Sequence, residues 1–157
     1  MKNIVVMGST GSVGIQSLDV ISKSKSHKVI GLSCYSNADL IFEQTKEYLP
    51  NFVAIEIIDS SHNLFNLCKE NNIKLITGNN ASCNIPFDNL DLAINAIVGT
   101  AGLKPTIELV NNGIDIALSN KESLGVGGHI IIPLAQKNNV NIIPVDSEHS
   151  AIFQCLN

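Results

Sequence analysis

The stretch "IVVMGSTGSVGIQSLDVI", residues 4–21, joins a strand-like apolar run to a glycine-rich turn and then to a helical pattern. Gly8, Gly11 and Gly14 lie in this turn at intervals of three residues. In a strand–turn–helix unit, small residues let the backbone approach a pyrophosphate, whose charge lies against the helix N-terminus. This order of elements predicts an α/β fold with a dinucleotide site after its first strand.

The glycine turn also has a simpler interpretation, as a tight turn in an α/β protein that binds no nucleotide. A glycine triplet alone is a weak signal, and its position directly after the first strand is what favours dinucleotide binding. In that interpretation, Thr10, Ser12 and Val13 present backbone N–H groups to the phosphates.

Residues 3–7 are the first of several apolar, β-rich segments separated by helical patterns. Several of these segments are apolar on both faces, which is typical of a parallel sheet covered above and below. The alternation predicts a doubly wound, Rossmann-type parallel sheet with helices on both faces. The other expected strands are residues 28–34, 52–58, 73–77, 92–98, 114–118 and 140–145.

Asn-Asn pairs at residues 71–72, 111–112 and 138–139 each stand between a helical pattern and the next expected strand. Asn tolerates the left-handed conformation that ends a helix, so each pair predicts a helix C-terminus. The segment "SLGVGGHIIIPLAQ", residues 123–136, contains three glycines and Pro133, so we expect any helix there to start late or to bend.

The composition predicts one folded, soluble domain. Of the 157 residues, 45% are hydrophobic and 15% charged, and the formal net charge is -4. Lys and Arg form no block, which argues against nucleic acid as a partner. The four cysteines have no spacing typical of zinc or a redox dithiol, which favours reduced thiols inside a cell.

The expected location is the bacterial cytoplasm. The sequence contains no signal-peptide pattern and no apolar run long enough to span a bilayer, so no membrane partner is expected. A protein of a plastid-type organelle, after removal of its transit peptide, would look the same.

The end of the second expected strand bears on the choice of cofactor. An NAD site usually has an acidic residue there, but residues 31–38 contain no carboxylate. Ser33, Ser36 and Asn37 could instead hydrogen-bond a 2′-phosphate, which favours NADP. As an alternative or additional role, Ser36 and Asn37 suit the cap of the next helix.

Three later strand ends carry small or charged residues where a cofactor and a substrate would meet. They are "NAIVGTAGLKP" (95–105), "ALSNKES" (117–123) and "IPVDSEHS" (143–150). By spacing alone, Lys121 and Glu122 are better explained as an exposed pair at a helix end, and His149 as a local hydrogen-bonding residue.

The motifs "GSTGSVG", "AIVGTAGLKPT", "NKESL" and "IPVDSEHSAIFQCL", in this order, resemble the 1-deoxy-D-xylulose 5-phosphate reductoisomerase family. The resemblance implies an NADPH-dependent, divalent-metal-dependent enzyme of the non-mevalonate isoprenoid pathway. Its reaction rearranges the carbon skeleton of 1-deoxy-D-xylulose 5-phosphate and reduces the resulting aldehyde to 2-C-methyl-D-erythritol 4-phosphate.

The resemblance also implies roles for individual residues. Asp146 and Glu148 would be ligands of Mg²⁺ or Mn²⁺, and the i, i+2 spacing on an extended backbone lets both face one cation. Lys121 and Ser147 would act in catalysis and contact the sugar phosphate, as Glu148 also would. Residues expected to line the NADPH site are Thr10, Gly11, Ser12, Val13, Ser36, Asn37, Asn120 and Glu122.

By the same resemblance, residues 1–145 form the NADPH-binding domain and residues 146–157 begin the catalytic domain. Members of the family continue into the rest of that domain, which supplies a third carboxylate ligand, and into a C-terminal helical domain. We therefore expect a homodimer for the full-length protein and no activity for these 157 residues alone.

Two other classes of protein remain as alternatives. A sugar-nucleotide epimerase needs a Tyr followed four positions later by Lys, whereas Tyr35 is followed by Asp39 and Tyr48 by Phe52. A nucleotide-sensing domain without catalysis would bind the cofactor without a metal. The close spacing of Asp146 and Glu148 argues against that class.

Overall fold

The computed structural model describes residues 1–146, 150–151 and 154–155, and they form one seven-stranded sheet. Every pair of neighbouring strands is parallel, in the order β4-β3-β2-β1-β5-β6-β7. All of the expected strands are confirmed, although several end earlier than predicted. Their bounds are Lys2–Met7 (β1), His27–Cys34 (β2), Phe52–Ile55 (β3), Lys74–Thr77 (β4), Leu92–Asn95 (β5), Asp115–Leu118 (β6) and Ile142–Pro144 (β7).

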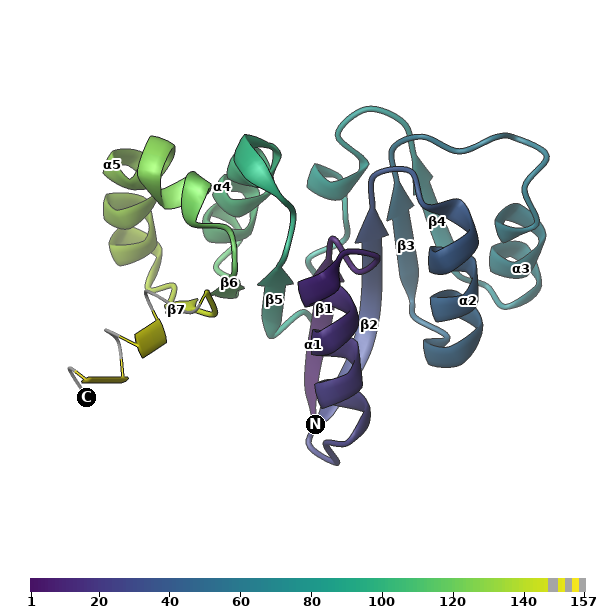
Figure 1. Ribbon diagram of the computed structural model, residues 1–157, viewed down its shortest axis with the longest axis horizontal. Coiled ribbons are helices and arrows are strands. Elements are labelled where there is room, and N and C mark those ends of the chain that lie inside the picture. The colour runs from purple at the N-terminus through teal and green to yellow at the C-terminus, as the bar shows by residue number, and fades with distance from the viewer. Residues whose placement is uncertain (147–149, 152–153, 156–157) are drawn as a thin grey trace.

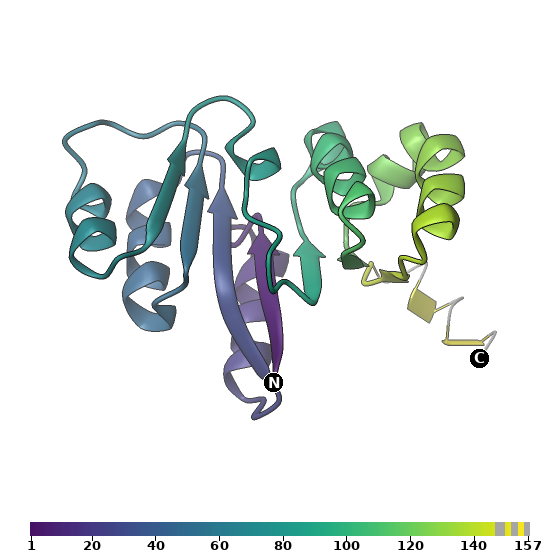
Figure 2. The ribbon, with the colours of Figure 1, turned by 180° about the vertical axis from the view of Figure 1, so that it is seen from behind.

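Helices cover both faces of the sheet, as predicted. Side chains alternate along β1: Ile4 and Val6 pack in a core with α1, α2 and α3, whereas Val5 and Met7 pack in a second core with α4 and α5. Figure 1 shows α1 in front of β1, and Figure 2, from behind, shows it behind the strand. The helices are Ser12–Ser22 (α1), Ala38–Tyr48 (α2), Leu64–Glu70 (α3), Leu103–Asn111 (α4) and Lys121–Asn138 (α5), with short 3-10 turns at Ala81–Cys83 (η1) and Gly99–Gly102 (η2).

The Asn pairs end helices as predicted, with one difference. Asn72 and Asn139 adopt left-handed conformations, with φ of 55° and 54°. After α4, Asn112 keeps a φ of -93°, and Gly113 takes the left-handed position instead, with a φ of 72°. Glycine adopts this conformation at lower cost than Asn, so at the end of α4 the left-handed residue is Gly113 and not Asn112.

The expectation of a late start for the helix in residues 123–136 is wrong. Helix α5 begins at Lys121 because the side chain of Asn120 caps it by accepting a hydrogen bond from the Ser123 N–H. A side chain at Gly127 would overlap Leu103 of α4, so this glycine lets the two helices pack closely.

The strand order reverses beside β1. The chain moves outward from β1 to β4, then crosses to the far side of β1 to form β5. At such a switch point the loops after the two central strands diverge, which creates the crevice where open α/β sheets bind ligands. In the described part of the chain, no helix is long and apolar enough to cross a membrane.

The contact between Gly31 of β2 and the ring of Phe52 of β3 gives a test of this packing. A Cβ at Gly31 would overlap the buried ring, so we expect Gly31→Ala to lower the free energy of unfolding by about 1–3 kcal/mol. In Gly125→Ala, the matched control on α5, the new methyl meets no atom within 4 Å. Urea unfolding followed by circular dichroism measures both variants. Equal midpoints for Gly31→Ala and the unmodified chain would contradict the assigned packing.

Candidate dinucleotide site at the switch point

The turn after β1 depends on glycine at two positions. Gly8 has a φ of 74°, and a Cβ there would lie 2.7 Å from the carbonyl oxygen of Ala96, in the loop after β5. A Cβ at Gly14 would lie 2.6 Å from the Cα of Ser9, so this glycine allows α1 to pack against the turn. Both positions therefore exclude a side chain for structural reasons.

Gly11 differs from the other two glycines because its surroundings are open. It is the N-cap of α1 with extended φ and ψ of -80° and 168°, and a Cβ there would meet only the Gly8 carbonyl oxygen, at 3.3 Å. Gly11 makes no side-chain cap, and the first turn of α1 contains no acidic residue. The first N–H groups of a helix lack intrahelical partners, so this end of α1 suits an anion.

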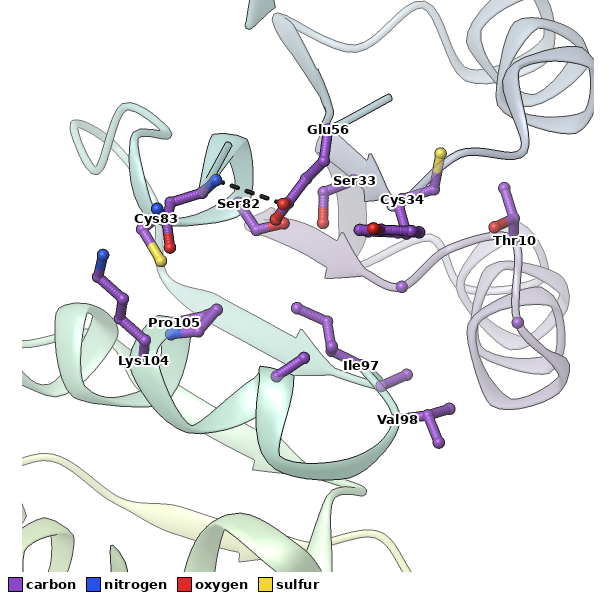
Figure 3. A pocket seen from close by; sticks show the side chains of 16 residues that line it. Thr10, Ser33, Cys34, Glu56, Ser82, Cys83, Ile97, Val98, Lys104 and Pro105 are labelled. Carbon is purple, nitrogen blue, oxygen red and sulfur yellow. Dashed lines mark hydrogen bonds between the residues drawn. The ribbon is translucent and has the colours of Figure 1, made fainter. Parts of the chain in front are cut away.

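Two cavities meet at this turn, and both are lined by Gly11 and by the loop residues Ala96, Ile97 and Val98. The larger has a volume of about 430 Å³ and opens over the ends of β1, β2 and β3 (Figure 3). The smaller, of about 260 Å³, opens over β1, β5, β6 and the segment after β7. The glycine turn thus stands between two spaces, as the phosphates stand between the halves of a dinucleotide.

The structure brings most of the predicted site residues to this crevice. Thr10 lines the larger cavity. Ser36 and Asn37 line neither cavity, and Asn37 caps α2 by accepting a hydrogen bond from the Leu40 N–H at 3.2 Å. The residues that line the smaller cavity include Ser12, Val13, Asn120, Lys121, Glu122 and Asp146.

The metal assignment rests partly on residues that are not described. Ser147, Glu148 and His149 lie outside the described residues, whereas Asp146 is described and faces the same cavity as Lys121. In the described ranges, no group of three or more His, Cys, Asp or Glu side chains is close enough to hold a metal ion. Of the two predicted metal ligands, Asp146 and Glu148, only Asp146 belongs to the described residues.

Asn120 fastens the wall of the smaller cavity. This residue is only 2% exposed, and its side-chain amide nitrogen donates to the Gly99 carbonyl at 2.6 Å and also to the Ile97 carbonyl. Its amide oxygen accepts from the Ser123 N–H at 2.7 Å. Asn120 thus ties the loop after β5 to the start of α5, and it positions Lys121 and Glu122 beside the crevice.

The larger cavity has polar residues that the sequence analysis missed, including Glu56 and Lys104. The predicted strand ran to residue 58, which placed Glu56 inside it, but β3 ends at Ile55. Glu56 follows the strand directly, where a carboxyl-end residue faces the ligand crevice. Lys104 lies in the first turn of α4, and the available signal was its place in the strand-end segment "NAIVGTAGLKP", residues 95–105.

The two thiols of the larger cavity are poorly suited to nucleophilic or metal chemistry. Burial raises the pKa of Cys34 to about 12. Burial also raises the pKa of Cys83, and this effect is partly offset by the positive charge of Lys104. Both thiols stay protonated near neutral pH.

Comparison with known proteins agrees with this geometry. The family model of 1-deoxy-D-xylulose 5-phosphate reductoisomerase matches residues 4–128. Two reductoisomerases are similar over nearly the whole chain: that of Thermoanaerobacter pseudethanolicus, 41% identical over 99% of this chain, and that of Macrococcus caseolyticus, 43% identical over 100%. The chain spans 41% of the length of each of these relatives.

Solved structures of reductoisomerases are also similar. One, in complex with NADPH, fosmidomycin and magnesium, superposes with a TM-score of 0.89 at 30% identity, over 99% of this chain and 39% of that chain. Another, from Zymomonas mobilis in complex with NADPH, gives a TM-score of 0.89 at 31% identity, and the match covers 98% of this chain and 41% of that chain. The glycine turn, the switch-point crevice and these matches lead to one conclusion: the chain belongs to the 1-deoxy-D-xylulose 5-phosphate reductoisomerase family.

Proposed function

We propose that the described residues form the NADPH-binding part of an enzyme that converts 1-deoxy-D-xylulose 5-phosphate to 2-C-methyl-D-erythritol 4-phosphate. The observation that carries this proposal is the open Gly11, which stands at an uncapped helix N-terminus between two cavities. A pyrophosphate at Gly11, Ser12 and Val13 would fill the space that a Cβ would take. The relatives solved with NADPH support the same assignment.

The two halves of the cofactor would then occupy different cavities. The adenosine half fits the larger cavity, which opens over the ends of β2 and β3. The nicotinamide half fits the smaller cavity, where Lys121, Glu122 and Asp146 gather. This orientation brings the hydride donor next to the residues that resemblance assigns to substrate and metal.

The residues present fit the metal in part. Asp146 offers a hard oxygen ligand at the smaller cavity, and Glu148 would supply the second, with a third carboxylate from beyond these residues. Bound Mg²⁺ or Mn²⁺ would supply Lewis-acid stabilisation of the oxygens of the substrate. Lys121 and Ser147 would hold and orient the sugar phosphate, and Asn120 would keep Lys121 in position through its cap of α5.

The wider assignments belong to the same proposal. Residues 1–145 would form the cofactor domain and residues 146–157 the entry into the catalytic domain, in a homodimer of the whole protein. This division is supported by the position of β7, which is the edge strand of the sheet and ends at Pro144, just before the proposed boundary. We place the whole protein in the bacterial cytoplasm.

Replacement of Gly11 tests the pyrophosphate assignment. Gly11 has a backbone conformation that Val can adopt, so we expect Gly11→Val to fold while its side chain excludes the phosphates. NADPH affinity, followed by the fluorescence of the bound nicotinamide, should fall by more than about 100-fold. Gly125→Val, at an exposed glycine lining neither cavity, is the control. Unchanged NADPH affinity in Gly11→Val would refute the assignment.

A comparison of NADPH and NADH tests whether the end of β2, which has no carboxylate, makes the site prefer NADPH. The unmodified protein should bind NADPH more tightly than NADH. A carboxylate at the exposed position of Ser36 would repel the 2′-phosphate, so Ser36→Asp should weaken NADPH binding about tenfold and leave NADH binding unchanged. Ser36→Ala, which adds no charge, should keep the original preference. Isothermal titration calorimetry with each cofactor measures this preference. Equal affinities for NADPH and NADH in the unmodified protein would disprove the prediction.

The metal assignment is tested in the whole protein by Asp146→Asn. This change removes a ligand charge and should lower kcat/KM at least about 100-fold, because the cation would no longer stabilise the oxygens of the substrate. NADPH affinity should change little, since the pyrophosphate turn is formed by other residues. Asp19→Asn, in an exposed ion pair with Lys23 on α1, is the matched control. Normal turnover by Asp146→Asn would rule the assignment out.

A further inference from the structure

The larger cavity has two distinct ends. Thr10 and the glycine turn lie at one end, and Glu56, Cys83 and Lys104 lie toward the other (Figure 3). Apolar side chains, among them Ile97, line the space between the two ends. A ligand whose phosphates lie at the turn would therefore reach the polar end with the group farthest from its phosphates.

Glu56 is held in a fixed position at that end. Its backbone N–H donates to the Tyr35 carbonyl at 3.1 Å, which joins the ends of β3 and β2. Its carboxylate oxygen Oε2 accepts a hydrogen bond from the Asn80 N–H at 3.3 Å, drawn as the dashed line in Figure 3. Among the described residues no donor reaches Oε1. An ionised carboxylate is only an acceptor, so this oxygen suits a donor group on a ligand.

Ser33 on the neighbouring strand provides a second, independent observation. This residue is 0% exposed and lines the same cavity, yet its hydroxyl has no hydrogen-bond partner among the described residues. The parallel register pairs Ser33 with Ala54, two residues before Glu56, so both side chains belong to the same face of the sheet. A buried hydroxyl without a partner is costly, and a ligand atom in the cavity would satisfy it.

The walls beside these groups suit a flat aromatic ring. Tyr35 after β2 is 65% exposed and Val98 after β5 is 85% exposed, although both line the cavity. A planar heterocycle between the two loops would cover these apolar surfaces, while its edge would face Glu56 and Ser33. Lys104 in the same cavity offsets the negative charge that Glu56 adds near a phosphorylated ligand.

We propose that Glu56, with Ser33 beside it, recognises the amino-bearing edge of adenine and makes this cavity select adenine over 6-oxopurines. This inference rests on the proposed function, because it assumes that the adenosine half of NADPH occupies the larger cavity. The 6-amino group of adenine donates to Oε1 of Glu56, and a ring nitrogen accepts from the Ser33 hydroxyl. A 6-oxopurine directs oxygen lone pairs at the carboxylate and is rejected.

The test compares NADPH with reduced nicotinamide hypoxanthine dinucleotide phosphate, which has an oxo group in place of the 6-amino group and therefore carries a proton on N1. Dissociation constants are measured with the whole natural protein by nicotinamide fluorescence. The unmodified protein should prefer NADPH by about tenfold or more. In Glu56→Gln the side-chain amide can donate to the oxo group, so the preference should fall to about twofold or less. Glu43→Gln, exposed on α2 and paired with Lys46, should keep the full preference.

The ratio of the two constants is independent of how much of a variant is folded, because both ligands are measured on the same sample. If NADPH binds but the unmodified protein shows no preference, or if Glu56→Gln keeps the preference, the role of Glu56 is overturned and the proposed function stands. If NADPH does not bind at all, the proposed function fails and this inference fails with it.

Discussion

The close approach of the backbone at Gly8 to the backbone at Ala96 is the constraint on which the rest of the site depends. β1 and β5 are neighbours in the sheet, but their following loops turn to opposite faces because the strand order reverses there. Gly8, with its left-handed φ, lets the two loops separate without a collision between a Cβ and the Ala96 carbonyl. The crevice, its two cavities and the open position of Gly11 all follow from this arrangement.

The second half of the crevice depends on a buried polar side chain. Asn120 satisfies carbonyls of the loop after β5 and also caps α5, so one residue fixes both sides of the smaller cavity. Hydrogen bonds of this kind are worth most where water is excluded, and Asn120 is almost fully buried. Because the polar atoms of the Asn120 side chain already bond the protein, the role that the structure shows for Asn120 is to position its neighbours Lys121 and Glu122, which line the smaller cavity.

Much of the fold was predictable from the sequence because a parallel sheet covered on both faces requires apolar strands and regular helix ends. The glycine turn, all of the strands and the left-handed Asn72 and Asn139 followed from such local rules. Strand ends were less predictable. The apolar patterns at residues 52–58 and 92–98 continue past the last paired residues of β3 and β5. The patterns therefore predict Glu56 and Val98 as strand residues, although both line the larger cavity. The early start of α5 depended on the Asn120 cap, which propensity alone does not reveal.

The central claim is that the turn after β1 holds the pyrophosphate between an adenosine cavity and a nicotinamide cavity. The most direct measurement is a titration of the ¹⁵N-labelled chain with NADPH, followed residue by residue through its backbone amide signals. The account predicts the largest shifts at Gly11, Ser12 and Val13, with accompanying shifts in the loops after β2, β3 and β5. Signals of the turn that stay unchanged at saturation, with shifts confined to α3 or to the outer strand β4, would contradict it.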